Sequence, residues 1–159
     1  MWLFKLMGAM LLVYSGVATS CELNRRATAA LTQNEGMLAL LRTVRGQIEC
    51  FARPISEILA SCDAEMLFAC GYRGEGMPSD LSTLLKACRG SDVDTIRIVT
   101  RFAEEFGRGH REDEVRACDY TLELLEARRQ TLSADLPVTK KRNTVLSVCG
   151  AMALALLLL

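Results

Sequence analysis

Residues 96–126 have the sequence IRIVTRFAEEFGRGHREDEVRACDYTLELLE, which holds two helical patterns joined by a glycine-rich turn. In the first pattern, apolar residues recur at helical spacing: Ile96, Val99, Phe102 and Phe106. After the turn at residues 107–109, an apolar seam follows a long charged segment that we expect to end as a helix before Pro137. The seam consists of Val115, Cys118, Leu122, Leu125 and Leu132. One apolar stripe per segment predicts α-helices that each bury one face.

The same pattern extends toward the N-terminus. Within residues 28–52, apolar residues recur at steps of four and three and form one stripe: Met37, Leu41, Val44, Ile48 and Phe51. Pro54 fits the first turn of a further helix, and Ser79 fits the N-cap of another. Residues 71–78, GYRGEGMP, have the composition of a loop. No stretch of useful length alternates with period two, so the middle of the chain is predicted to be an all-α bundle of about four or five helices.

The charges are confined to the middle of this 159-residue chain. Every acidic residue and every basic residue except Lys5 lies within residues 22–142. The apolar flanks approach the length of about 20 residues that a transmembrane helix needs. The expected fold class is therefore all-α, with N- and C-terminal transmembrane helices at 1–21 and 143–159 flanking a cytoplasmic helical bundle at 22–142.

Two basic clusters set the expected orientation. They adjoin the apolar flanks on the side of the middle segment: Arg25, Arg26, Lys140, Lys141 and Arg142. Because basic residues are retained on the cytoplasmic side, we expect a multi-pass protein of the cell membrane with a cytoplasmic central region. For the first flank, the alternative is a cleaved signal peptide, which makes the chain an exported lipoprotein processed before Cys21. For the second flank, the alternative is a buried core helix.

The composition excludes several classes of function. The formal net charge is zero, so the chain has no basic excess with which to bind the phosphates of a nucleic acid. The seven cysteines contain no C-x-x-C pair and His110 is the only histidine, which argues against a zinc site. An odd number of cysteines at irregular spacing fits a reducing compartment. The glycine-rich residues 71–76 lack the lysine and the hydroxyl residue of a phosphate-binding loop. We therefore predict no catalytic residue, no metal, no cofactor and no enzymatic activity.

Residues 96–126 resemble the corresponding region of the stage III sporulation protein AB family. In that family an apolar helix ends in an aromatic residue or leucine followed by glycine, a short Gly–x–Ser–Asp turn follows, and a long charged helix begins. The whole chain has a similar plan, with an N-terminal span, a helical middle, and a basic cluster before a C-terminal apolar span. The resemblance implies a helical domain similar to one repeat of the inner-membrane platform protein of type II secretion and type IV pilus systems.

The turn also departs from the family pattern. Gly107 matches the family's glycine, but Gly109 stands where serine is usual, His110 replaces the aspartate, and Glu114 replaces a glutamine. The acidic residues after the turn still place negative charge at the N-terminus of the long helix. We therefore expect the turn to survive and to be a candidate partner contact with these members: Phe106, Gly107, Gly109, His110, Arg111 and Glu114.

By resemblance, such proteins act in the mother cell of endospore-forming bacteria, within a multiprotein channel across the membranes around the forespore. The implied function is a membrane-anchored platform component of that secretion-like channel, needed for endospore formation, in the mother-cell membrane facing the forespore. Its implied partners are other channel proteins, including a cytoplasmic ATPase, and membrane lipid, and a homo-oligomer is left open. The residues alone also allow a generic membrane-anchored helical adaptor, and a turn whose role is only structural.

Overall fold

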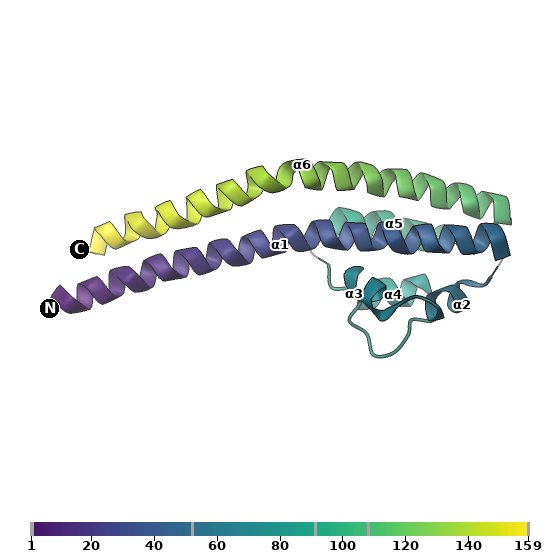
Figure 1. The fold of residues 1–159 in the computed structure, drawn as a ribbon, viewed down its shortest axis with the longest axis horizontal. Coiled ribbons are helices and arrows are strands. Elements are labelled where there is room, and N and C mark those ends of the chain that lie inside the picture. Colours follow the sequence, from purple (N-terminus) through teal and green to yellow (C-terminus); the bar gives the residue numbers. More distant parts are fainter. Residues whose placement is uncertain (1, 52, 91, 108, 159) are drawn as a thin grey trace. The chain divides into compact units, whose positions relative to one another are not determined.

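Six α-helices form the regular structure of the described residues (Figure 1). The computed structural model describes residues 2–51, 53–90, 92–107 and 109–158, and their side chains except those at 2–6, 9, 155, 157 and 158. The helices are α1 (Trp2–Phe51), α2 (Ile55–Ala60), α3 (Ala64–Ala69), α4 (Leu81–Ala87), α5 (Val93–Glu105) and α6 (Arg111–Leu158). Within the described ranges, extended segments pair only at an isolated bridge between Tyr72 and Cys88. The predicted all-α class is confirmed.

The chain divides into two compact units. Residues 1–29 and 133–159 form the two-helix unit, which contains the first part of α1 and the last part of α6. Residues 30–132 form the core unit, which contains α2 to α5 and the remaining parts of α1 and α6. Both long helices therefore contribute to both units, and no helix ends at the predicted boundaries after residues 21 and 142.

The core unit buries the apolar stripe predicted for its part of α1. Met37, Leu41 and Val44 are fully buried, and Ile48 is nearly so. They belong to one apolar cluster with side chains from the other helices of the unit, including Ile58, Leu59, Leu84, Val99, Phe102 and Leu125. Removing such side chains from water is the main driving force for folding. The predicted last member of the stripe, Phe51, is instead exposed, because α1 ends at this residue and the apolar cluster does not extend to it.

The seam predicted for the first part of α6 also faces this core. Cys118 and Leu125 are fully buried, and Val115 and Leu122 pack against the cluster while remaining partly exposed. On α5, Val99 and Phe102 are buried. The helical spacing in residues 96–126 therefore identified the buried face of both helices correctly.

Two aspartates of the core unit cap helices with their side chains. The Asp80 carboxylate accepts hydrogen bonds from the Thr83 backbone N–H at 2.6 Å and from the Thr83 hydroxyl at 2.9 Å, which makes Asp80 the N-cap of α4. The prediction of Ser79 as this cap is wrong by one residue, because a carboxylate is a stronger acceptor than a hydroxyl. Asp92 caps α5 in the same way, accepting from the Thr95 backbone N–H at 3.1 Å.

Helix α6 continues through Pro137, although the sequence predicts that the helix ends before it. Proline lacks the N–H that would bond to the carbonyl four residues earlier, here that of Ser133. Both residues are exposed, so water can donate to the freed carbonyl. The loss of one backbone hydrogen bond on the solvent-exposed face of a helix leaves the other backbone hydrogen bonds intact. Helix α6 therefore continues to Leu158.

In the two-helix unit, α1 and α6 pack against each other in antiparallel orientation (Figure 1). Gly16 lies against Ala151, and the Asn143 side-chain amide donates to the Asn24 side-chain carbonyl at 3.3 Å. Gly16 thus pairs with a later position of α6 than Asn24 does, as expected for two antiparallel helices. The ends of the chain thus form a helical pair.

The sequence predicts transmembrane helices at residues 1–21 and 143–159. No helix in the part of the chain that the structure describes is long and apolar enough to cross a membrane. This part of the predicted fold class is therefore not supported, whereas the helical character of both segments is confirmed.

Candidate functional site

The glycine turn joins α5 to α6. At the end of α5, the Phe106 backbone N–H donates to the Phe102 carbonyl at 2.9 Å. Gly107 then has a φ of +84°, a left-handed conformation that glycine adopts without strain and that commonly ends a helix. The His110 carbonyl accepts from the Asp113 backbone N–H at 2.9 Å, and α6 begins there. The glycine is required at position 107 by the backbone alone.

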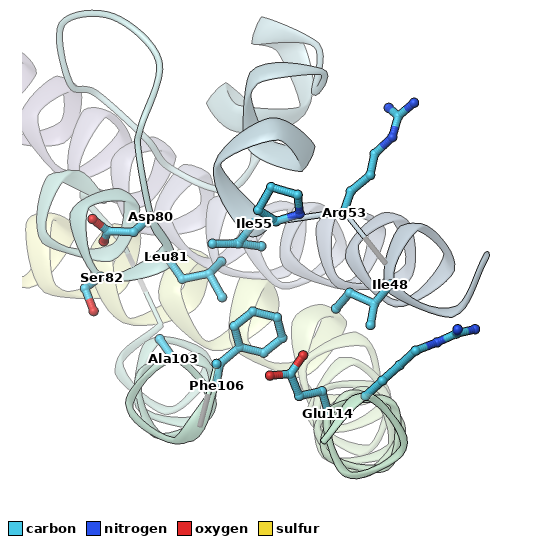
Figure 2. Close-up of a pocket in the computed structure, with 12 residues that line it drawn as sticks. Ile48, Arg53, Ile55, Asp80, Leu81, Ser82, Ala103, Phe106 and Glu114 are labelled. Atoms are coloured by element: carbon cyan, nitrogen blue, oxygen red, sulfur yellow. The ribbon is translucent and has the colours of Figure 1, made fainter. Parts of the chain in front are cut away.

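A cavity of about 440 Å³ lies beside this turn (Figure 2). It is formed where the ends of α1 and α5 meet the beginnings of α2, α4 and α6. Its lining consists of Ile48, Arg53, Pro54, Ile55, Asp80, Leu81, Ser82, Ala103, Phe106, Gly107, Arg111 and Glu114. All of these residues belong to the core unit, so the cavity is a product of that unit's tertiary fold.

The floor of the cavity is apolar. Figure 2 shows the side chains of Phe106, Ile55, Leu81 and Ile48 facing a common space. Leu81 and Ile48 are buried, and Phe106 and Ile55 are half-buried. The Phe106 ring packs on the ring of Phe102, with centroids 5.1 Å apart and planes tilted by 51°, an arrangement that aromatic pairs favour. These contacts hold the apolar floor in place.

Charged side chains form the rim, and two of them already have partners. The hydrogen bonds from the Thr83 backbone N–H and hydroxyl hold the pKa of the Asp80 carboxyl below its ordinary value. The Arg111 guanidinium donates to the Glu49 backbone carbonyl, one of the carbonyls that the C-terminal end of α1 leaves unpaired. Asp80 and Arg111 therefore help to build the site.

The other two rim charges remain available. The Glu114 carboxylate points into the cavity beside Phe106, and within the described residues it forms no hydrogen bond or ion pair (Figure 2). Arg53 projects away from the floor, with its guanidinium 5.5 Å from the centroid of the exposed Phe51 ring. It likewise forms no ion pair in the part of the chain that the structure describes. An apolar floor between an acidic and a basic group suits a partner segment that carries an apolar anchor and charges of both signs.

Of the six residues predicted to form a partner contact at the turn, some line the cavity and others do not. Four of them line the cavity: Phe106, Gly107, Arg111 and Glu114. Gly109 and His110 do not, and both are exposed, with His110 beside a separate surface hollow. The sequence did not identify the contributions of residues 53–55 and 80–82. No local pattern could have found them, because they reach the turn only through tertiary packing.

The five basic residues predicted to set the topology lie elsewhere. All belong to the two-helix unit: Arg25, Arg26, Lys140, Lys141 and Arg142. None of them lines the cavity. Any role they have in orienting the chain is therefore separate from the cavity.

The core unit also contains a buried polar cluster that no pattern in the sequence predicts. Asp92 is only 6% exposed, and its carboxylate accepts two hydrogen bonds from Arg128, at 3.0 and 2.6 Å. The Thr95 hydroxyl donates to the same carboxylate at 2.6 Å, and the Asn34 amide donates to that hydroxyl at 2.9 Å. Burial raises the pKa of the Asp92 carboxyl, but the hydrogen bonds from Arg128 and Thr95 outweigh it and lower the pKa to about 2. The cluster joins α1, α5 and α6.

Burial controls the chemistry of the core cysteines. It raises the pKa of the Cys70 thiol to about 12, that of Cys88 to about 11 and that of Cys118 to about 12. Such thiols stay protonated near neutral pH, and a protonated thiol is a weak nucleophile and a weak metal ligand. Among the described residues, no group of three or more His, Cys, Asp or Glu side chains is arranged to hold a metal ion.

The chain matches no protein-family model, no curated protein and no solved structure.

Proposed function

We propose that the chain is a membrane-anchored, non-enzymatic platform component of a secretion-like sporulation channel, which docks a partner at the cavity beside the glycine turn. The cavity is the observation that carries the docking proposal, because an apolar floor and two available charges meet there at the junction of five helix ends. The resemblance of residues 96–126 to the stage III sporulation protein AB family supports the sporulation part, including a place in the mother-cell membrane facing the forespore.

The cavity has the features of a binding hot spot. Protein interfaces concentrate their binding energy where an apolar or aromatic anchor enters a pocket, while charges at the rim select the partner and its orientation. Phe106 and Leu81 supply the apolar surface, and Glu114 and Arg53 supply charges of opposite sign. The partner that the resemblance implies is a cytoplasmic ATPase, so the proposed ligand is an exposed segment of that protein with an apolar side chain between charged ones.

Membrane anchoring is supported by the apolar sequence of the flanks and by their surface. In the two-helix unit, Met10 and Tyr14 are 75% and 76% exposed, which is unfavourable in water and acceptable in hydrocarbon. A generic membrane-anchored adaptor would share this geometry. The neighbouring genes separate the two proposals, since a sporulation platform is expected beside an ATPase gene and genes for small membrane proteins.

Paired variants test the docking proposal in the full chain. Arg53→Ala with Glu114→Ala removes the available rim charges, and Arg116→Ala with Glu112→Ala removes the same residue types from exposed positions that do not line the cavity. Both variants are expected to stay folded: Arg53, Glu112 and Arg116 are exposed, and the half-buried Glu114 carboxylate forms no hydrogen bond or ion pair in the described part of the chain that its removal would break. Melting temperatures of both variants check this. The rim variant alone should lose capture of the ATPase and sporulation.

Two outcomes would count against the proposal. If the rim variant stays folded and still captures the ATPase at the wild-type level, the cavity is not the docking site. If both variants lose capture equally, the effect is one of general surface charge.

A further inference from the structure

The two-helix unit is held together by an unusually close approach of its helices. Gly16 is buried against α6, and a Cβ placed on it would lie 2.6 Å from the Ala151 Cβ and 2.8 Å from the Ser147 carbonyl oxygen. Only glycine allows α1 and α6 to come so close at this point. Small residues at such a crossing are typical of helices that associate in an apolar surrounding, where large apolar side chains gain nothing from leaving the solvent.

Hydrogen bonds between the helices continue from this crossing. The Thr144 hydroxyl accepts from the Ser20 hydroxyl at 3.1 Å and from the Asn24 amide at 3.3 Å, and donates to the Lys140 carbonyl at 2.9 Å. The Asn24 amide oxygen in turn accepts from Asn143 at 3.3 Å. Because these polar side chains hydrogen-bond to each other, they do not depend on water for hydrogen-bond partners. The two helices can therefore leave water together at a lower free-energy cost than either could alone.

The outer surface of the pair is apolar. Six large apolar side chains of the pair are more than half exposed: Met10, Leu11, Tyr14, Leu146, Met152 and Leu156. Soluble proteins rarely expose so many large apolar side chains close together in the sequence, and where they gather they mark a site of interaction with a membrane or with another protein.

A basic collar adjoins this apolar surface. We define the basic collar as Arg25, Arg26, Lys140, Lys141 and Arg142. Because Gly16 lies against Ala151 and Asn24 against Asn143, the antiparallel register places the two halves of the collar at the same level of the pair. The five cations and the two carboxylates of the flanking sequence, Glu22 and Asp135, leave a net charge of +3.

Most of the collar is uncommitted. Within the described residues, Arg26 pairs with Glu22 at 3.1 Å, and the other four cations form no ion pair. Lys140 is half-buried and the rest are exposed. A cluster of free cations next to an apolar surface is complementary to a lipid surface that carries negative headgroups above hydrocarbon.

We propose that the two-helix unit binds an anionic lipid surface as one paired element, with the basic collar at the lipid phosphates and the exposed apolar side chains in the hydrocarbon. This inference rests on the proposed membrane attachment and adds to it the lipid class and the paired state of the two chain ends. Each uncompensated cation near an anionic surface strengthens binding by about fivefold. A net charge of +3 therefore predicts a preference for anionic vesicles on the order of a hundredfold at low salt, which weakens as salt screens the charges.

Vesicle flotation of the full chain tests the proposal. The protein, freed of detergent, is mixed with vesicles of phosphatidylcholine alone or of phosphatidylcholine with one part in four of phosphatidylglycerol. The collar variant replaces all five collar cations with glutamine. The control removes five exposed cations from the core unit: Lys86→Gln, Arg89→Gln, Arg97→Gln, Arg101→Gln and Arg116→Gln. Helical content measured by circular dichroism checks that both variants are folded.

The wild type and the control are expected to prefer the anionic vesicles, and the collar variant is expected to bind both kinds equally. Equal binding of the wild type to both kinds would overturn the lipid preference while leaving the membrane attachment in place. A collar variant that keeps the preference, or a control that loses it, would also overturn the role of the collar. A wild type that stays off both kinds of vesicle, and associates with a second copy instead, would overturn both this inference and the proposed attachment.

Discussion

The core unit buries most of its large apolar side chains, whereas the two-helix unit buries small residues and leaves large apolar side chains exposed. In the first, Met37 and Leu125 are fully enclosed. In the second, the buried positions are Gly16, Ser20 and Ala151. Both patterns occur along α1 and along α6, so helix formation alone does not decide what is buried. This contrast in what is buried is what the proposed lipid attachment of the two-helix unit requires, and the predictions below test whether the contrast is real.

The strongest way to test this contrast is to truncate one leucine in each unit. Leu125→Ala should lower the free energy of unfolding by about 2–5 kcal/mol, because it leaves a cavity in a closely packed core. Leu146→Ala, at a position that is 66% exposed, should change it by about 0.5 kcal/mol or less. Denaturant unfolding of the full chain in detergent micelles measures both. Equal losses at the two positions would mean that Leu146 is covered and that the contrast between the units is false.

A smaller effect concerns the buried ion pair of the core unit and its dependence on pH. The Asp92 carboxyl has a pKa of about 2 in the folded chain and an ordinary value of 3.8. Its ionised form is therefore favoured by folding, and the resulting stabilisation is present above pH 4 and is lost as the pH falls from about 4 to about 2. The expected loss is on the order of 2 kcal/mol.

Unfolding measured across that pH range in the wild type and in Asp92→Asn checks this expectation. The free energy of unfolding of the wild type should decrease as the pH falls. Asp92→Asn should have a lower free energy of unfolding than the wild type at pH 7, and this free energy should decrease less as the pH falls. Asp63→Asn, which removes an exposed carboxylate at the N-cap of α3, is the matched control. An unchanged slope in Asp92→Asn would show that other carboxyl groups cause the acid sensitivity.

The smallest expected effect lies in the two-helix unit, where two glycines provide a matched pair. Gly16→Ala adds a methyl group that collides with Ala151 and Ser147, and should destabilise the chain by about 1 kcal/mol. Gly150→Ala adds the same group to α6 where nothing lies within 4 Å, and should stabilise by roughly 0.5–1 kcal/mol through helix propensity. Opposite signs in denaturant unfolding would support close packing of the helical pair. Stabilisation by both substitutions would show that the helices do not approach at Gly16.

Features that depend on helical spacing could be predicted from the sequence. The stripe from Met37 to Ile48 and the buried residues Cys118 and Leu125 were identified because burial on one face of a helix repeats with the helical period. The glycine turn was found because Gly107 and Gly109 interrupt two such patterns. The error at Phe51 has the same origin, since a repeating pattern does not show where the core stops.

Features that depend on which helices meet could not be predicted. The cavity needs Ile55 and Leu81 to reach Phe106 from other parts of the chain, and the buried ion pair needs Arg128 to reach Asp92. In the sequence, Arg128 is simply one of many charges on a long helix. The continuation of α6 through Pro137 could not be predicted either. Proline locally disfavours a helix, but the intact backbone hydrogen bonds before and after Pro137 stabilise the helix as a whole.

The pairing of the chain ends has a consequence for biosynthesis. Ser20 and Thr144 are separated by 124 positions, so the first part of α1 cannot meet its partner until those intervening residues have been made. At a synthesis rate of about 5–20 residues per second, that delay is roughly 6–25 s. Throughout this interval Gly16 and the apolar residues around it have no second helix to contact. During synthesis the apolar part of α1 is therefore exposed without its partner helix, and whatever binds such helices beside the ribosome can meet it before the last part of α6 does.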